Sequence, residues 1–505
     1  MEILDSHNVR VEELERCVDF EGVETGVAGI HIVDAGSTLP DRRRYLCFFN
    51  HRHLSFRLAE VEAAAELLYG LSHAPDGLPV IVWEEPGDGL VASSFWYFHV
   101  HVDFGGDDMM SRLANECLLV KCILDIWGEG LTLLETQKMV GKYDPEVKRL
   151  YSGEDQSFKF VIDGWGTAIS HDEKLAIIDS FEQYTGFKGP IRMKDPMHLY
   201  WVIIARPSKH STVPGRRPWY AFGRQVGVNE ARGPLLQKYD LKKRRYLGPT
   251  TMDSELAFIM CTLCSVRKSS FVVDPFVGTG GLLVPAAARG AITFGMDIDM
   301  RVIKIGKKDR HGNAVNVWTN FRDYNLASPV GLVRADIDRN PFRPGLTDMF
   351  DVILADPPYG VRAGGRKSKS DPNSKITDRD THIPSTAPYP LAECLMDLLE
   401  WSAKVLVIGG RLGYWLPCLP ASSEDELPRH PMLKMKYNCE QVLGRYSRRL
   451  VIMEKIRHHD PLEADRYFRD NPMPEKMAID ELWDVVYAPA DPSQEKKPIF
   501  RSKTV

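Results

Sequence analysis

Beyond Gly248, short apolar runs alternate with helical stretches, and each run ends at or near a polar residue. The runs are SFVVD, AITFGMDID, GLVRAD, DVILAD and GRLGYWLPC. This alternation is typical of a doubly wound parallel sheet with helices on its faces. Two further runs, CEQVLGRY and RLVIMEKI, are separated by a short turn and predict a hairpin at the sheet edge. We therefore expect an α/β domain over residues 249–458, built on a mostly parallel seven-stranded sheet.

A glycine-rich turn, GTGG, follows the first of these runs and precedes a helical stretch. In parallel sheets, ligands bind beyond the carboxyl ends of the strands, and glycine lets the backbone approach them closely. The turn matches neither the dinucleotide fingerprint nor the phosphate loop. Asp274 stands just before the turn, where an acid can take the ammonium of an amino-acid moiety. Pro285 predicts a kink or a late start of the helix.

Acids also end the next two runs. Asp297 lies about twenty residues after the turn, where an acid suits a ribose diol. Asp336 ends the third run, where a carboxylate can accept from an exocyclic amine. A single acid at a strand end also arises from turn chemistry. The three acids, in strand order, can thus bind an ammonium, a ribose and an adenine. S-adenosylmethionine contains all three groups, so we expect it as the cofactor.

The stretch DVILADPPYG joins a buried strand to a stiff corner with Asp356, Pro357, Pro358 and Tyr359. An exocyclic amine on a base is a poor nucleophile, because its lone pair is delocalised into the ring. Asp356 and the Pro357 carbonyl can accept hydrogen bonds from such an amine, and proline adds no competing N–H. Tyr359 can stack on a base that has been taken out of its stack. The corner predicts methylation of a base amine, with these four as catalytic residues.

Four motifs carry a family resemblance. DPFVGTGG, DID, AD and DPPYG, in this order after YLGPTTMDSELAF, resemble the amino-methylating branch of class I methyltransferases. The resemblance is greatest to the catalytic subunits of eukaryotic tRNA (guanine-10-N2)-methyltransferases, over about residues 44–458. DPPYG alone indicates the reaction type, whereas LGPTTMDSELAFIM and the first half of the chain narrow the family.

The resemblance implies a fold, a cofactor and partners. It implies a class I methyltransferase domain after an α+β THUMP-like region that binds tRNA, and a small zinc-binding methyltransferase activator as partner. The expected activity is methyl transfer from S-adenosylmethionine to the N2 amino group of guanosine 10. The cofactor site is expected to comprise Thr250, Thr251, Asp274, Phe276, Gly278, Gly280, Asp297, Ile298, Asp336 and Ile337.

The first half of the chain mixes strands and helices. Strands are predicted in YLCFF, LPVIVWEE, SSFWYFHVHV, SFKFVIDGWG and LYWVIIARPS. A helix is predicted through Leu58, Val61, Ala65 and Leu68, and another over MMSRLANECLLVKCILDIWGEG, closed by glycine. Residues 44–213 are therefore expected to form a compact α+β region.

Residues 214–248 are basic, aromatic and rich in Gly and Pro, which predicts a linker on a surface. Surfaces that mix basic and aromatic side chains often bind single-stranded nucleic acid or the ends of tRNA. The expected RNA-binding residues are Arg216, Arg217, Trp219, Lys242, Lys243, Arg244 and Arg245. Residues 361–390 form a long polar segment, which we expect to order over the target nucleotide. Residues 1–43 are predicted to be an N-terminal extension, and residues 459–505 a C-terminal tail.

Composition limits the classes further. The chain has 505 residues, 44% of them hydrophobic, and no apolar run of the roughly 20 residues that a membrane span needs. The acidic N-terminus lacks a signal-peptide layout, so we expect a cytoplasmic protein. Nine irregularly spaced cysteines indicate reduced thiols. Cys261 and Cys264 lack further ligands for zinc, so we expect a buried helix face and no metal. The net charge of −5 means that phosphate binding requires a local basic face.

Two alternatives to tRNA guanine methylation remain open. An N6-adenine DNA or RNA methyltransferase would use the same corner, but the RNA-binding-like first half argues against it. A catalytically dead RNA-binding scaffold would keep the fold without the chemistry. The intact acids at the strand ends argue against that alternative.

Overall fold

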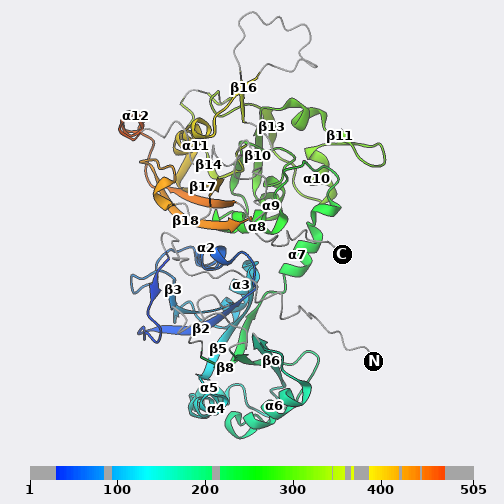
Figure 1. Ribbon diagram of the computed structural model, residues 1–505, viewed down its shortest axis with the longest axis vertical. Helices are drawn as coiled ribbons and strands as arrows, with labels where there is room; N and C mark the ends of the chain where they lie inside the picture. The colour runs from blue at the N-terminus through cyan, green and yellow to red at the C-terminus, as the bar shows by residue number, and fades with distance from the viewer. Residues whose placement is uncertain are drawn as a thin grey trace, which may run out of the picture. The chain divides into compact units, whose positions relative to one another are not determined.

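The computed structural model describes residues 30–84, 94–165, 167–206, 217–339, 341–343, 345–358, 365–368, 386–419, 423–443 and 446–471. The chain divides into two compact units, shown in Figure 1. Unit 1 comprises Met1–Lys243 with Ser254–Ser265, and unit 2 comprises Arg244–Asp253 with Val266–Val505. No helix among the described residues is long and apolar enough to cross a membrane.

Unit 1 is built on an eight-stranded sheet in the order β1-β3-β4-β2-β5-β8-β7-β6. The pairs β1–β3 and β6–β7 are parallel, and the other neighbours are antiparallel. The strands are β1 (Ile32–Val33), β2 (Arg42–Phe49), β3 (Ile81–Glu84), β4 (Phe95–His101), β5 (Val120–Gly130), β6 (Phe158–Trp165), β7 (His198–Ala205) and β8 (Trp219–Val228). The helices are α2 (Arg57–Tyr69), α3 (Asp107–Glu116), α4 (Leu133–Lys142), α5 (Pro145–Arg149), α6 (His171–Thr185), α7 (Arg232–Lys238) and α8 (Ser254–Leu263).

The side chains of β7 divide between two hydrophobic clusters. Trp201 and Ile203 belong to one cluster, whereas Tyr200 and Val202 belong to the other. This split follows from the two-residue period of a strand, which sends neighbouring side chains to opposite faces. The apolar run LYWVIIA therefore forms a central strand that is buried on both faces.

Two expectations for unit 1 are wrong. The helix predicted over MMSRLANECLLVKCILDIWGEG ends at Glu116, and Val120–Gly130 forms strand β5. The apolar run from Cys117 onward suits a strand with partners on both sides, β2 and β8. The surface linker predicted at residues 214–248 contains β8, which pairs with β5 and β7 inside the sheet.

The ends of the chain also carry structure that the sequence did not predict. Within the N-terminal extension, β1 pairs with β3. Within the C-terminal tail, residues Pro461–Asp470 form α12, which Asp460 caps. Residues 1–29 and 472–505 lie outside the described residues.

Unit 2 contains a seven-stranded sheet in the order β13-β10-β9-β14-β17-β19-β18. The first four junctions are parallel and the last two antiparallel, which confirms the mostly parallel sheet with an edge hairpin. The strands are β9 (Phe271–Asp274), β10 (Ile292–Asp297), β13 (Gly331–Arg334), β14 (Phe350–Ala355), β17 (Leu406–Cys418), β18 (Leu433–Val442) and β19 (Ser447–Lys455). The helices are α9 (Leu283–Ala288), α10 (Val317–Asp323) and α11 (Leu391–Val405).

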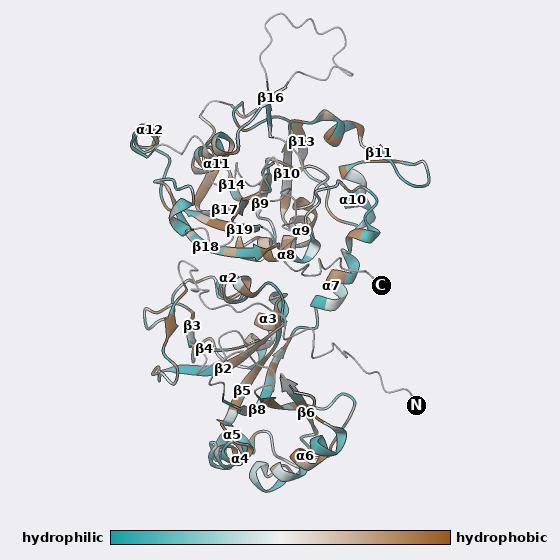
Figure 2. Cartoon of the chain, viewed as in Figure 1, coloured by the Kyte–Doolittle hydropathy of each residue, from teal (hydrophilic) through white to brown (hydrophobic). Residues whose placement is uncertain are grey.

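One face of this sheet is covered by α11. Its apolar side chains Leu395, Leu398 and Leu399 share a core cluster with Ile353 of β14 and Leu412 of β17. Figure 2 shows the hydrophobic stretches along β17 and β19 that contribute to this core. α9 begins at Leu283, so Pro285 stands near its start, where a missing N–H costs little. The expected late start of this helix is confirmed.

Candidate functional site

Four acids meet at one edge of the unit 2 sheet. Strands β13, β10, β9 and β14 are consecutive parallel neighbours, so their carboxyl ends lie side by side. Asp274 and Asp297 are the last residues of β9 and β10. Asp336 follows β13 by two residues, and Asp356 follows β14 directly. The spatial order is therefore Asp336, Asp297, Asp274, Asp356.

Asp274 is the most buried of the four, at 1% exposure. Burial raises the pKa of its carboxyl well above the ordinary value. A hydrogen bond from the Phe276 N–H, at 2.9 Å from Oδ1, opposes that rise, whereas the charges of Asp297 and Asp356 add to it. A cation at this edge would restore the ionised form, because it would offset both the burial and the neighbouring charges.

The glycine turn after β9 has the backbone that only glycine adopts readily. Gly278 has φ of 47° and Gly280 has φ of 81°, both in the left-handed region. The Gly278 N–H donates to Oδ2 of Asp297 at 2.8 Å, and the Asp299 N–H donates to Oδ1 at 2.9 Å. Burial raises the pKa of Asp297, and these N–H groups oppose the rise. Asp297 therefore connects the end of β10 to the turn after β9.

The stretch LGPTT is hydrogen-bonded to the same turn. The hydroxyl of Thr251 bonds the N–H and the carbonyl of Gly248, both at 3.0 Å. It also lies 3.1 Å from the hydroxyl of Thr279, a residue that the sequence reasoning did not select. Thr250 is exposed.

Asp336 is 6% exposed and accepts two backbone hydrogen bonds. The Arg339 N–H donates to Oδ1 at 2.7 Å, and the Ser368 N–H donates to Oδ2 at 2.5 Å. Ile337 is buried in the core cluster beside α11. Ile298 is partly buried, and its carbonyl accepts from Arg334 Nε at 3.2 Å.

Ser368 belongs to a short strand that links the corner after β14 to Asp336. β15 (Arg366–Ser368) pairs antiparallel with β16 (Thr386–Pro388). A Cβ on Gly365, just before β15, would lie 3.5 Å from the Pro358 carbonyl oxygen. β15 thus starts beside the end of β14 and reaches Asp336 beyond the end of β13. The sequence offered no signal for this strand, because its three residues lie in a polar segment.

The corner after β14 is described as far as Pro358. Asp356 and Pro358 are partly buried, and Pro357 is buried. Tyr359 and residues 369–385 of the long segment lie outside the described residues. The structure thus places Asp356 and both prolines beside the glycine turn, where the sequence predicted them.

The predicted RNA-binding residues do not form one exposed cluster. Trp219 is 8% exposed and packs in a core cluster of unit 1, so the prediction that it binds RNA is wrong. Arg244 is 5% exposed, so its predicted role is also wrong. The guanidinium of Arg245 forms an ion pair with Asp323 at 2.6 Å. Arg217, Lys242 and Lys243 are exposed, and Arg216 lies outside the described residues.

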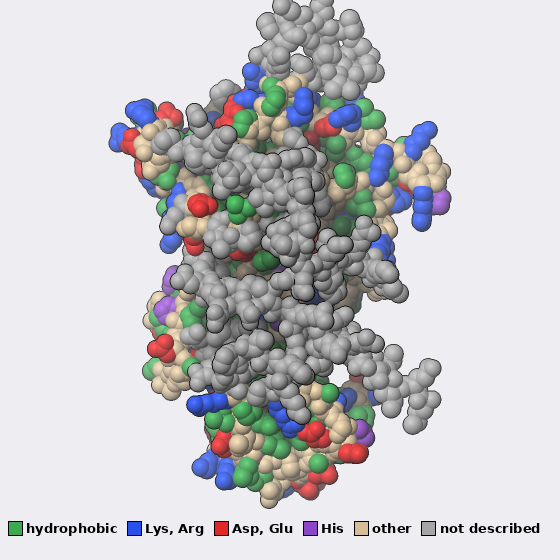
Figure 3. Space-filling view, in the orientation of Figure 1, with side chains coloured by type: hydrophobic (Ala, Val, Ile, Leu, Met, Phe, Trp, Pro, Cys, Tyr) green, Lys and Arg blue, Asp and Glu red, His purple; other side chains and the backbone are tan. Residues whose placement is uncertain are grey.

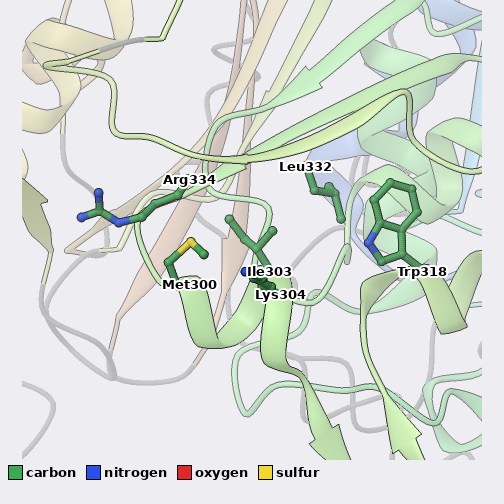
Figure 4. Close-up of a pocket in the computed structure, with 6 residues that line it drawn as sticks. All are labelled: Met300, Ile303, Lys304, Trp318, Leu332 and Arg334. Atoms are coloured by element: carbon green, nitrogen blue, oxygen red, sulfur yellow. The ribbon is translucent and has the colours of Figure 1, made fainter. Parts of the chain in front are cut away.

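A cavity of about 240 Å³ lies on unit 2, next to the ends of β10 and β13. It is lined by Met300, Ile303, Lys304, Trp318, Leu332 and Arg334. In Figure 4 the Arg334 guanidinium points away from the indole of Trp318, and the apolar side chains lie between them. The lining contains no acid, so this cavity differs in chemistry from the acidic edge.

The donor set of the acidic edge fits S-adenosylmethionine. The buried carboxyl of Asp274 suits an ammonium, and the left-handed glycines keep side chains away from the turn that a ligand would approach. Hydroxyl and carboxylate oxygens from Thr251, Asp297 and Asp336 surround the same turn and strand ends. Cys261 of α8 and the neighbouring Cys264 are buried, as expected of a helix face. Among the described residues, no cluster of three or more His, Cys, Asp or Glu side chains is placed to hold a metal ion.

Comparison with known proteins gives matches over both units. A family model described as the Tmrp11 THUMP N-terminal domain matches residues 93–231. A model described as RMKL-like, methyltransferase domain matches residues 242–378. The tRNA (guanine(10)-N(2))-methyltransferase TRMT11 of Gallus gallus is 33% identical over 440 residues, which cover 85% of this chain and 91% of that relative.

Two further relatives carry the same name. The TRMT11 protein of Homo sapiens is 32% identical over 439 residues, covering 84% of this chain and 90% of its own length. The TRMT11 protein of Dictyostelium discoideum is 33% identical over 436 residues, covering 82% of each chain. The similarity therefore extends over most of the chain in animals and in an amoeba.

Proposed function

We propose, from the premise that this chain belongs to the tRNA (guanine(10)-N(2))-methyltransferase family, that it methylates the N2 amino group of guanosine 10 in tRNA. The methyl donor is S-adenosylmethionine. One structural observation carries the proposal: Asp356 and its two prolines stand beside the glycine turn and three further acids on adjacent parallel strands. The matched relatives cover both the methyltransferase unit and the unit before it.

S-adenosylmethionine, when bound, supplies an electrophilic methyl group on a sulfonium. Asp274 would hold its ammonium, Asp297 its ribose and Asp336 its adenine amine. Gly278 and Gly280 leave the turn open to close approach, and the Thr251 hydroxyl is placed beside the same turn. Phe276, Ile298, Ile337 and Thr250 are assigned to the rest of this site.

Asp356 acts on the base. Its carboxylate and the Pro357 carbonyl accept hydrogen bonds from the exocyclic NH2 group of guanine, which localises the lone pair and orients it. Positioning of this kind supplies much of the rate of a two-substrate reaction. Asp356 need not remove a full proton before transfer, because methylation makes the nitrogen acidic. Tyr359 is assigned to stacking on the guanine, and the segment 361–390 to ordering over it.

Unit 1 is the proposed binding region for the body of the tRNA. The THUMP match over residues 93–231 supports this role. Arg217, Lys242 and Lys243 remain candidates for phosphate contacts, because their side chains are exposed. We also propose a small zinc-binding activator subunit as partner, by family resemblance, and the cytoplasm as the compartment. If the chain is purified from its own cells and no zinc-binding protein is purified with it, the proposed activator is wrong. If microscopy finds the chain outside the cytoplasm, the proposed compartment is wrong.

The proposed reaction is tested by labelling. Bulk tRNA is incubated with the full chain, the activator and S-adenosylmethionine labelled at the methyl group, then digested to nucleosides. Label in N2-methylguanosine supports the proposal. Label in methyladenosine supports an adenine methyltransferase instead. No transfer, with retained tRNA binding, supports a scaffold without catalysis.

A further inference from the structure

A β-hairpin of unit 2 carries cations that neither the fold nor the proposed chemistry uses. Its strands are β11 (Lys307–Lys308) and β12 (Ala314–Val315), paired antiparallel. Figure 1 shows the hairpin projecting from the rest of this unit, and Figure 3 shows Lys, Arg and His side chains gathered on it. Residues 306–315 contain three Lys or Arg residues, one His and a single acid. We refer to residues 306–315 as the basic hairpin.

The single acid, Asp309, is engaged inside the turn. Its Oδ1 accepts from the N–H of His311 at 2.9 Å and of Asn313 at 3.0 Å. Desolvation opposes ionisation of this carboxyl, but these N–H groups outweigh it and lower the pKa of Asp309. Its Oδ2 lies 3.6 Å from Nη1 of Arg245. Asp309 therefore organises the turn, and no other carboxylate among the described residues forms an ion pair with the cations at the tip.

The two cations nearest the tip are Lys308 and Arg310, and both are exposed. The ion pairs of the described residues include none with either side chain. Arg310 Nε bonds the neighbouring ring nitrogen of His311 at 3.1 Å, which leaves its charge in place. Exposed charges of one sign without partners contribute little to stability, so folding does not explain them.

The hairpin is held in a defined place. Gly306, at its base, has φ of 70°, and a Cβ there would lie 2.2 Å from the carbonyl oxygen of Val315. Lys307 Nζ donates to the Leu247 carbonyl at 2.7 Å, and the Tyr246 hydroxyl donates to the Val302 carbonyl at 2.9 Å. The tip cations are therefore presented on an ordered support, which lowers the entropy cost of binding a partner.

The position of the hairpin connects it to the methyl-transfer edge. β10 ends at Asp297, a helical turn follows at Arg301–Ile305, and the hairpin begins at once after it. A substrate that approaches the carboxyl ends of the strands thus meets the segment that carries these cations. The chain as a whole has a net charge of −5, so this is a local basic surface rather than a general one.

We propose that the basic hairpin binds backbone phosphates of the tRNA substrate, with Lys308 and Arg310 as the contacts. The proposal rests on the proposed function, because tRNA is the polyanion that must reach this edge. Phosphate contacts release counterions, so they make RNA binding depend on salt concentration. An acidic surface of a protein partner is the competing class of ligand, and the test separates the two.

The test compares the double variant Lys308→Gln/Arg310→Gln with the wild-type full chain. Binding of a fluorescent, unmodified tRNA transcript is measured by anisotropy without methyl donor, from about 50 to about 200 mM salt. Loss of two phosphate contacts should make the slope of log K against log salt shallower by about 1.5, and raise the Kd about five- to tenfold. In turnover assays, the KM for tRNA should rise while kcat is unchanged.

Two controls make the comparison specific. Arg267→Gln/Lys268→Gln removes the same two charges from an exposed pair before β9, at the amino end of the strands. This variant should bind tRNA as the wild type does. Lys308→Arg/Arg310→Lys keeps the charges and should retain the affinity and the salt slope, which separates charge from hairpin folding.

An unchanged Kd and salt slope in Lys308→Gln/Arg310→Gln would overturn the proposal. If the same variant binds tRNA as the wild type does but no longer binds a purified protein partner, the proposal is also overturned, and the hairpin is a protein contact. The binding measurement contains no methyl donor, so it does not depend on catalysis. If wild-type reactions form no N2-methylguanosine, the proposed function is contradicted, but the binding data still test the role of the hairpin.

Discussion

Asp274 is 1% exposed, and its carboxyl lies within the electrostatic range of two other acids, Asp297 and Asp356. Burial raises its pKa well above the ordinary value. A group whose folded-state pKa is raised in this way binds a proton more tightly in the folded than in the unfolded state. Ionised Asp274 therefore destabilises the protein without a cation, and the stability cost grows as the pH rises from the pKa of this group in the unfolded chain to its raised pKa in the folded chain.

The first prediction concerns this ionisation. Below the raised pKa of Asp274, binding of S-adenosylmethionine should release a proton and should strengthen as the pH rises, because only the carboxylate of Asp274 can pair with the ammonium. Calorimetry in buffers of different ionisation enthalpy, between about pH 5 and pH 7, measures the proton count while the cofactor amine stays protonated. In Asp274→Asn the proton release should disappear and the affinity should fall. Equal proton release in variant and wild type would contradict the assignment.

The second prediction concerns Asp356. Asp356→Ala should lower the rate of methyl transfer by about 100-fold or more, because it removes the group that orients the base amine. Cofactor affinity should stay close to that of the wild type, since Asp274, Asp297 and the glycine turn are untouched. Single-turnover kinetics and calorimetry measure the two quantities. Wild-type turnover in this variant would refute the catalytic role.

At the scale of elements, β15 is the feature that most directly links the two halves of the site. It begins directly after Gly365, where a Cβ would lie 3.5 Å from the Pro358 carbonyl oxygen, and it ends at Ser368, whose N–H reaches Asp336. It thereby connects the corner after β14 with Asp336 beyond the end of β13. An element in this place can orient Asp336 and shield the edge from water.

The third prediction tests β15 through one N–H group. Ser368→Pro removes the donor to Asp336, and a hydrogen bond to a charged group contributes about 1.5–3 kcal/mol. The Kd for S-adenosylmethionine should therefore rise about tenfold or more. Ser368→Ala keeps the N–H and should bind as the wild type does. If both variants bind equally well, β15 does not position Asp336.

The fourth prediction concerns α8 in unit 1. Glu255 accepts from Arg232 Nη2 at 2.6 Å, and Arg52 and His53 lie within 3.7 Å of its carboxylate. Burial opposes ionisation of Glu255, but these partners outweigh it and lower its pKa from 4.5 to about 2. A shift of this size corresponds to roughly 3 kcal/mol of stability above pH 4.5, lost as the pH falls toward 2.

Glu255→Gln should therefore unfold at a lower temperature than the wild type at neutral pH. The difference between the two should shrink as the pH falls below about 4.5, since the wild type then loses the ionised form. Thermal melts across this pH range measure it. A difference that stays constant with pH would mean that the carboxylate charge does not contribute.

Local pattern predicted most elements, and non-local pairing explains those that were missed. The apolar runs that end in acids became β9, β10, β13 and β14, because a strand buried on both faces has a strong pattern of its own. β8 escaped prediction because its Gly, Arg and aromatic residues resemble a linker until β5 and β7 pair with it. β11, β12 and β15 are two or three residues long, which is too short for any periodicity.

At the scale of the whole molecule, the two kinds of site residue differ in how well sequence predicts them. Strand-end acids are placed by the register of the sheet, so Asp274, Asp297 and Asp356 came together as expected. Surface residues have no such constraint. Trp219 is buried by the sheet around β8, and Arg244 is buried in unit 2, so neither is available to RNA.

The substrate is also decided at this scale. The proposed role of the Asp356 corner requires an amine of a base, but it does not define which base or which RNA. That information comes from the rest of the chain, because the match to the named relatives covers 82% to 91% of their lengths. The matched relatives span both units, and the proposed reaction assigns methyl transfer to one unit and tRNA binding to the other.

Mapping of the modified nucleotide tests this account most directly. Two unmodified tRNA transcripts, one with guanosine 10 and one with adenosine 10 and a matching partner base, are treated with the full chain, the activator and S-adenosylmethionine. Mass spectrometry of nuclease fragments should locate N2-methylguanosine at position 10 of the first transcript alone, and Asp356→Ala should abolish it. Methyladenosine at position 10 of the second transcript, or methylation of another guanosine with guanosine 10 unmodified, would contradict the account.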